Sequence, residues 1–249
     1  MLSFKKIAVL LLLAFMSLNL YAEIQIIPRQ PTDVFLFYSA SPRQSASDGT
    51  GRNSPFAASF LKYASSGEPL PLLAIDIAKE TLNLTSGRQA PVFESYIYNN
   101  KNYSIVNTGP AKRYALVVGI NDYYNANMKF ANPANDAQDI ASTLRRFGYE
   151  VDLRIDVDLG VMERAINDFT GKLRADRESE GFFWFAGLGI EMDGGQYLLP
   201  GNASLSSETL MQSSAVSLDY LINNLQSAGN KINLAFIDTD RTPFFNWTR

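Results

Sequence analysis

The sequence predicts an α/β fold built around a mainly parallel sheet. Four short segments are apolar without alternation, at residues 34–38 (VFLFY), 114–120 (YALVVGI), 182–186 (FFWFA) and 232–237 (INLAFI). Such runs are typical of strands that are buried on both faces, as strands of parallel sheets are. Segments with the apolar spacing of helices separate the last three runs, and strands that alternate with helices favour parallel pairing.

The first part of the chain is expected to contribute two helices and a strand. Pro55 suits the first turn of a helix, and it follows a Ser-, Gly- and Pro-rich loop at residues 39–53. A second helix is predicted over residues 70–84, and a strand over residues 92–98. The apolar side chains that we expect to face inward are Phe56, Phe60, Leu61 and Ala64 in the first helix, and Leu72, Leu73, Ile77 and Leu84 in the second.

The rest of the chain predicts three more helices, a strand and a hairpin. Asn132 is expected to cap a helix that begins at Pro133 and ends at Gly148. The next strand is expected around Val151 and Leu153. Apolar spacing then predicts helices around residues 162–173 and 218–225, and a hairpin at residues 192–199 that turns at Gly194 and Gly195.

The first 22 residues have the features of a secretory signal peptide. Lys5 and Lys6 precede an apolar run at residues 7–16, and Ala22 is a small residue suited to cleavage before Glu23. A membrane anchor is the less favoured alternative, because the run is shorter than the roughly 20 residues that a spanning helix needs. We therefore expect a secreted or periplasmic protein with no membrane contact after signal cleavage.

Composition excludes several classes of function. The formal net charge is −3, and removal of two signal-peptide lysines makes it more negative, which argues against nucleic-acid binding. The chain contains no cysteine, so it forms no disulfide framework. It also contains no histidine, the usual general base near neutral pH and the commonest zinc ligand. We expect no cofactor and no metal.

Five motifs follow one another in the second half of the chain. They are ALVVGINDYY at residues 115–124, NPANDAQDI at 132–140, FAGLGIE at 185–191, YLLPGNA at 197–203 and DTDRTPF at 238–244. In order, spacing and strand placement they resemble the caspase and metacaspase peptidases. The resemblance implies a caspase-like three-layer sandwich, in which helices cover both faces of a mostly parallel six-stranded sheet.

Both catalytic positions of that family are altered in this chain. The resemblance places the catalytic histidine at Leu188 and the nucleophilic cysteine at Asp240. A leucine transfers no proton, and a carboxylate is a poor nucleophile toward an amide, so we expect no cysteine-peptidase activity. The alternative is a hydrolase that uses other groups, such as the hydroxyl of Thr239 together with Asp240.

The resemblance also implies a pocket for a basic side chain. Two aspartates that form this pocket in metacaspases correspond to Asp136 and Asp238, and a carboxylate pair suits a charge-assisted contact with Arg or Lys. The alternative is structural, with Asp136 capping its helix and Asp238 held by backbone N–H groups. The arginine with which animal caspases bind acidic ligands would fall near Phe130, so the resemblance gives no support for an acidic ligand.

The first half resembles segments that follow the cysteine strand in ordinary members of the family. These segments are SASP at residues 39–42, SASDGTGRNSPF at 45–56 and GRQAP at 87–91. We therefore expect a circular permutation, with a small-subunit-like half at residues 23–98, a polar linker at 99–112 and a large-subunit-like half at 113–249. The alternative is a swapped dimer, in which each first half completes its neighbour's fold.

The family pairs an extended peptide with the edge of the strand that corresponds to residues 34–39, a form of β-augmentation. We expect Ser39, Ala40 and Ser41 to lie beside such a peptide; the alternative is that they begin a loop. Together these features predict an exported pseudopeptidase that binds a peptide or protein. A regulator or decoy that pairs with an active caspase-like homologue is a further alternative, and a homodimer is compatible with each.

Overall fold

A six-stranded sheet organises the protein, for which the computed structural model describes residues 32–97, 103–106, 109–124, 128–192 and 194–239. The strand order is β2-β1-β11-β7-β3-β6. All neighbouring strands are parallel except β2, which is antiparallel to β1. The strands are β1 (Asp33–Tyr38), β2 (Val92–Tyr96), β3 (Arg113–Gly119), β6 (Glu150–Ile155), β7 (Glu180–Ala186) and β11 (Ile232–Asp238). The expected α/β fold with a mostly parallel sheet is confirmed.

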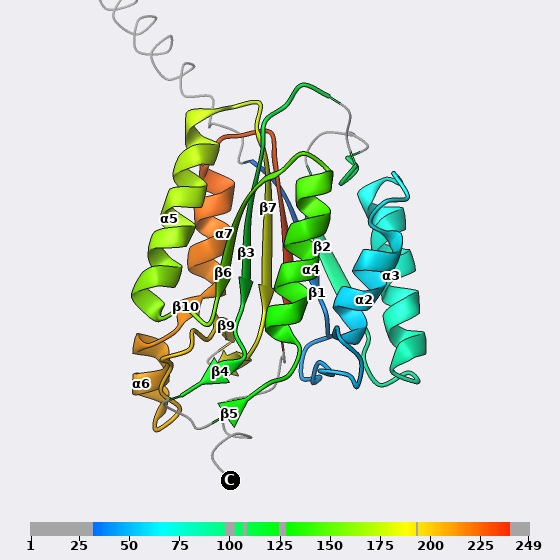
Figure 1. Ribbon diagram of the computed structural model, residues 1–249. Helices are drawn as coiled ribbons and strands as arrows, with labels where there is room; N and C mark the ends of the chain where they lie inside the picture. Colours follow the sequence, from blue (N-terminus) through cyan, green and yellow to red (C-terminus); the bar gives the residue numbers. More distant parts are fainter. Residues whose placement is uncertain (1–31, 98–102, 107–108, 125–127, 193, 240–249) are drawn as a thin grey trace, which may run out of the picture. The chain divides into compact units, whose positions relative to one another are not determined.

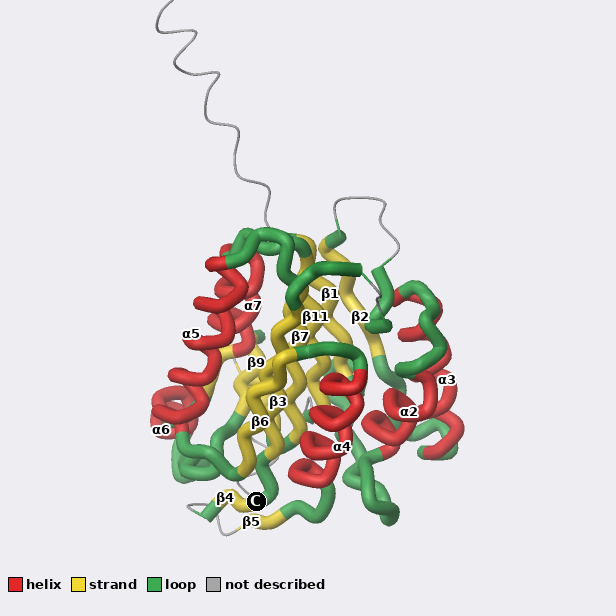
Figure 2. Tube along the Cα trace, turned by 45° about the horizontal axis from the view of Figure 1, so that its top comes forward, coloured by secondary structure: helices red, strands yellow, loops and turns green. Residues whose placement is uncertain are grey.

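Helices cover both faces of this sheet (Figure 1; Figure 2 shows the same layers after rotation). One face carries α2 (Pro55–Tyr63), α3 (Leu70–Leu84) and α4 (Pro133–Arg146), and the other carries α5 (Leu159–Ala175) and α7 (Leu218–Ser227). The smaller elements are β4 (Asp122–Tyr123), β5 (Met128–Lys129), β8 (Gly189–Met192), β9 (Gly195–Leu198), α6 (Glu208–Ser213) and β10 (Val216–Ser217). None of the helices in the described ranges is long and apolar enough to cross a bilayer.

The apolar strands supply two separate cores, because successive side chains of a strand point to opposite faces. In β3, Leu116 and Val118 pack on the α5 and α7 side, whereas Ala115 and Val117 pack on the α4 side. These strands have continuous apolar runs because both of their faces are buried, as the sequence predicted. Gly119 ends β3 where a side chain would collide with Pro133 and Ala137, so its lack of a Cβ lets α4 begin directly against the sheet.

The first half of the chain completes the sheet that the second half begins. β1 pairs in parallel with β11 along its whole length, from Asp33 opposite Ile232 to Tyr38 opposite Ile237. β2 and helices α2 and α3 then extend the fold beyond β1. One polypeptide thus brings its first and last described strands side by side.

The linker predicted at residues 99–112 is partly buried. Residues 98–102 and 107–108 lie outside the described part, but Tyr103 and Ile105 are buried in the core beside α3 and α4. The Tyr103 hydroxyl donates to Asp33 over 3.2 Å, and its carbonyl accepts from the N–H of Leu70 over 2.8 Å. Residues 103–106 therefore lie between β2 and β3 with two of their side chains packed in the core.

Two local expectations also need correction. Leu72 and Leu84 are each 53% exposed, because the inward face of α3 is formed by Leu70, Leu73, Ala74, Ile77 and Thr81. Asn132 occupies the N-cap position of α4, but its side chain makes no capping bond. Its amide donates to the carbonyl of Asp48, and Asn121 supplies the acceptor for the N–H of Ala134, at 2.7 Å. Gly148, with φ of 83°, follows α4 as expected.

Candidate ligand-binding site

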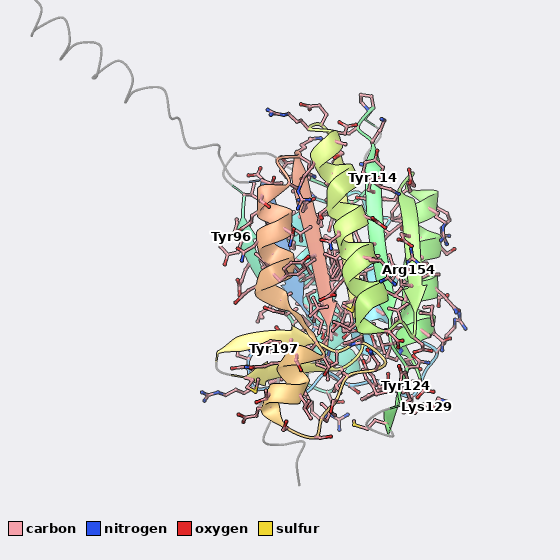
Figure 3. The ribbon with its side chains drawn as sticks, turned by 90° about the vertical axis from the view of Figure 1, so that its left-hand side faces the viewer. Tyr96, Tyr114, Tyr124, Lys129, Arg154 and Tyr197 are labelled. Carbon is pink, nitrogen blue, oxygen red and sulfur yellow. The ribbon has the colours of Figure 1, made fainter. Side chains whose placement is uncertain are left out.

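The carboxyl ends of β1, β3, β7 and β11 meet at one edge of the sheet, because these strands are parallel. This edge is the lower end of the sheet in Figure 1, where β4 and β5 also lie. In Figure 3 the labelled side chains of Tyr124 and Lys129 mark the same end of the molecule. Ligands of parallel α/β proteins bind at this kind of edge, so it is the first place to look for a site.

A small cavity of about 40 Å³ lies at this edge. Three of the lining residues within the described ranges are aspartates, and none of those described residues is a lysine or an arginine. It therefore brings together Leu188, Asp136 and Asp238, which the sequence had singled out separately. The lining residues are Ala46, Ser47, Asp48, Ser54, Phe130, Pro133, Asp136, Ala186, Gly187, Leu188, Asp238 and Thr239.

Ser54 joins the two buried aspartates of this cavity. Its backbone N–H donates to the carboxylate of Asp136, 3.0 Å from Oδ1 and 3.4 Å from Oδ2. Its hydroxyl donates to Oδ2 of Asp238 over 2.6 Å and accepts from the N–H of Ala57 over 3.0 Å, which caps α2. One residue of the first half thus holds two carboxylates of the second half.

Burial dominates the electrostatics of Asp136, which is 1% exposed. Removal from water and, to a smaller extent, the nearby charge of Asp238 raise the pKa of Asp136 to about 7, against hydrogen bonds from Asn53 and Ser54 that lower it. The cation Arg52 lies close enough to interact electrostatically with Asp136, but it is hydrogen-bonded to Asp139. The Asp136 carboxyl therefore exchanges its proton near neutral pH, and a cation placed beside it would drive that proton off.

Leu188 is 1% exposed, and its side chain belongs to the apolar core on the α5 and α7 side. Its N–H donates to the hydroxyl of Tyr123 over 2.5 Å, and its carbonyl accepts from the N–H of Leu199 over 3.0 Å. Gly187 before it has φ of 153°, and a side chain there would meet the same Tyr123 hydroxyl. The segment Gly187–Leu188 is thus hydrogen-bonded to Tyr123 of β4, and Leu188 contributes to the lining of the cavity.

Thr239 is 2% exposed and lies at the other side of the cavity. Its Oγ1 accepts a hydrogen bond from the side-chain amide of Gln196 over 3.0 Å. An amide donor cannot remove a proton, so this contact does not activate the hydroxyl as a nucleophile. Asp240, the position that resembles the catalytic cysteine, lies outside the described residues.

A model of the caspase domain family matches residues 112–243. The chain belongs to the caspase domain family. A crystal structure of a protein from Geobacter sulfurreducens is similar at 17% identity with a TM-score of 0.38, over 51% of this chain and 50% of that one. This chain therefore spans about half the length of that protein. The curated proteins contain no match.

The matched segment of the caspase domain contains Asp136, Leu188 and Asp238, whereas residues 32–97 lie outside the match. The cavity nevertheless needs both parts, because Ala46, Ser47, Asp48 and Ser54 come from the unmatched part. For Asp136 the structure shows a contact with a neighbouring helix besides its place in the first turn of α4. Asp136 accepts from the N–H of Ser54, the N-cap residue of α2, and Asp238 accepts from the hydroxyl of the same residue.

Ser39, Ala40 and Ser41 are tied into the caspase domain and are not among the residues that line the cavity. The N–H of Ser39 extends the pairing of β1 by donating to Ile237 over 2.9 Å, and its carbonyl accepts from Gln89 over 2.9 Å. Ser41 donates to the carbonyl of Ala90 over 2.9 Å. Their proposed contact with a peptide stays a prediction.

Sequence reasoning missed Ser54 and Asp48. Ser54 carried a local signal, since Ser before Pro55 is a typical helix start, and the cap is indeed formed. No local sequence pattern predicted the hydrogen bonds of Ser54 to Asp136 and Asp238. Asp48 sits in a loop, where its carboxylate accepts from the N–H of Ala131 over 3.0 Å and so fixes the loop over the start of α4.

Proposed function

We propose that this protein is a caspase domain without cysteine-peptidase activity that binds a cationic side chain of a peptide or protein. One observation carries the first part: the chain has no cysteine and no histidine, and Leu188 fills the position that resembles the catalytic histidine. Its side chain is buried in an apolar core, so this position offers neither a base nor a proton donor.

The second part is supported by the chemistry of the cavity. Its described lining contributes the acidic residues Asp48, Asp136 and Asp238. A buried carboxylate that lacks a cationic neighbour costs free energy, and a ligand cation recovers part of it through a charge-assisted hydrogen bond. Asp136 is 1% exposed, and the guanidinium of Arg52 is hydrogen-bonded to Asp139 rather than to Asp136.

Peptide hydrolysis and peptide binding test the two parts separately. Peptides that carry a single Arg or Lys are expected to remain intact on prolonged incubation, and to bind in calorimetry. Asp136→Asn and Asp238→Asn are expected to weaken binding. Asp139→Asn is the matched control, because Asp139 lies one turn along α4 and pairs with Arg52 outside the cavity lining. Equal losses in all three variants would contradict the assignment of the cavity, and turnover by the parent protein would contradict the first part.

We also propose that the order of the two halves arose by circular permutation. The parallel pairing of β1 with β11 supports this idea, because it joins the unmatched first part to the last strand of the matched segment. The permutation can be tested with a variant in which residues 103–239 precede residues 32–97 and a flexible linker joins the two segments. Retention of the far-ultraviolet circular dichroism spectrum and of a cooperative melt is the expected result, whereas an unfolded product would contradict it.

Export is a further proposal, supported by Lys5, Lys6 and the apolar run at residues 7–16. The experiment is to express the full chain in a bacterial host and to sequence the N-terminus of the fractionated protein. A mature form that begins at Glu23 outside the cytoplasm is expected. An intact N-terminus in the membrane fraction would favour an anchor instead.

A further inference from the structure

The geometry points to a primary ammonium, in preference to a guanidinium, as the group that this cavity takes up. The inference rests on the proposed binding of a cationic side chain and names the class of that cation. It concerns the cavity between Ser54, Asp136 and Asp238. The size of the cavity and the arrangement of its acceptors support it.

The size of the cavity comes first. Its volume is about 40 Å³, which is a few times the roughly 10–15 Å³ that one water molecule needs by the same kind of measure. An ammonium is a compact point charge, close in size to a water molecule. A guanidinium is a broad planar fork with five N–H donors. The cavity therefore accommodates an ammonium with less displacement of its walls.

The arrangement of the acceptors favours the same group. A guanidinium binds best when both oxygens of one carboxylate receive two parallel N–H bonds. Both oxygens of Asp136 already face the N–H of Ser54, at 3.0 and 3.4 Å, and Oδ2 of Asp238 receives the Ser54 hydroxyl at 2.6 Å. Ser54 thus occupies the paired geometry that a guanidinium would require. An ammonium needs one lone pair from each of several acceptors.

A further acceptor lies beside the same wall. Gln196 is 9% exposed, and its Oε1 has no hydrogen-bond partner within the described part of the chain. Its amide nitrogen donates to Thr239, which lines the cavity. Three N–H bonds of an ammonium can serve several acceptors that lie in different directions.

Three peptides that differ at one position test the inference. They carry Lys, Arg or norleucine between the same small neighbours, and calorimetry at pH 8 measures their binding to the full chain. We expect the Lys peptide to bind about tenfold more tightly than the Arg peptide, which corresponds to about 1.4 kcal/mol. Equal binding, or tighter binding of the Arg peptide, would overturn the ammonium inference and leave the proposed function standing. If neither exceeds the norleucine peptide, the proposed function itself fails.

Ser54→Ala supplies an independent readout. The substitution removes the hydroxyl from Asp238 and enlarges the cavity, while the backbone N–H to Asp136 stays. We expect the Lys-to-Arg affinity ratio to fall at least threefold. Ser59→Ala is the matched control on the same helix, since its hydroxyl bonds to Pro55 outside the cavity. An unchanged ratio in Ser54→Ala would contradict the role of Ser54, and if that variant fails to fold, the ratio of the parent protein decides.

Discussion

The hydroxyl of Ser54 donates to Oδ2 of Asp238 over 2.6 Å, across 184 positions of the sequence. This bond connects the start of α2 with the end of β11, and so connects the two halves of the chain at the cavity. Through its backbone N–H the same residue also holds Asp136. Ser54 is therefore expected to influence both the stability of the fold and the chemistry of the cavity.

Ser54→Ala should lower the free energy of unfolding by about 1–3 kcal/mol, because it removes a helix N-cap together with a hydrogen bond to a charged group. Urea unfolding followed by circular dichroism measures this loss. Ser59→Ala loses a bond to Pro55 of its own helix and an acceptor for the Thr81 hydroxyl, which keeps its bond to Ile77, so it is expected to cost less than about 1 kcal/mol. A larger loss in Ser59→Ala than in Ser54→Ala would show that the bridge contributes little.

Asp136 should make the unliganded protein less stable as the pH rises. Its folded pKa, about 7, exceeds the unfolded value near 3.8, so between these values the folded state binds more protons than the unfolded state. The contribution is favourable below about pH 4, declines as the pH rises to about 7, and is constant above. Asp136→Asn should abolish this decline when urea unfolding is compared at pH 5 and pH 8.

The matched control for this pH effect is Asp139→Asn. Its partner Arg52 lowers the pKa of Asp139, so that carboxyl titrates below its ordinary value and contributes no pH dependence between pH 5 and 8. The control should therefore follow the parent protein across this range. A parent protein whose stability is flat between pH 5 and 8 would contradict the raised pKa of Asp136.

Binding of a cationic peptide should strengthen as the pH rises. A bound cation favours the ionised form of Asp136, so binding releases a proton wherever that carboxyl is protonated beforehand. Affinity is expected to fall about tenfold for each pH unit below about pH 7 and to be constant above it. Calorimetry at pH 6 in two buffers of different ionisation enthalpy should detect close to one released proton. The same slope in Asp136→Asn would assign the proton to another group.

Leu188→His should destabilise the protein by about 1–3 kcal/mol, because it places a polar ring in the apolar core on the α5 and α7 side. The free energy of unfolding in urea measures this effect. Leu188→Met keeps an apolar side chain of similar volume and should cost less than about 1.5 kcal/mol. A histidine variant with parental stability and an ordinary pKa would show that this position faces open solvent.

Ile105→Ala should cost about 2–4 kcal/mol, the usual loss for a fully buried aliphatic side chain. The result would show that residues 103–106 belong to the core rather than to a passive linker. Equilibrium unfolding in urea measures it, and Lys112→Ala is the exposed control nearby, with an expected change within about 0.5 kcal/mol. Equal effects of the two substitutions would contradict the burial of Ile105.

The strands were predictable because burial on both faces leaves a continuous apolar run in the sequence, as β3 and β7 demonstrate. Which residues of α3 are buried was less predictable. Leu72 has the same chemistry as Leu73, yet Leu72 is exposed and Leu73 is buried. The difference depends on which face of α3 packs against α2. Because α3 has apolar residues on two faces, their spacing in the sequence does not identify the buried face.

Taken by itself, the sequence determined the α/β class, the family resemblance, and the absence of cysteine and histidine, since these depend on local periodicity, motif order and composition. The tertiary structure alone decided that Ser54 lies between Asp136 and Asp238, which are 82 and 184 positions away. It also decided that the cavity between them is small. Such contacts arise where the register of the strands brings distant loops together, and no local pattern records a hydrogen bond across that distance.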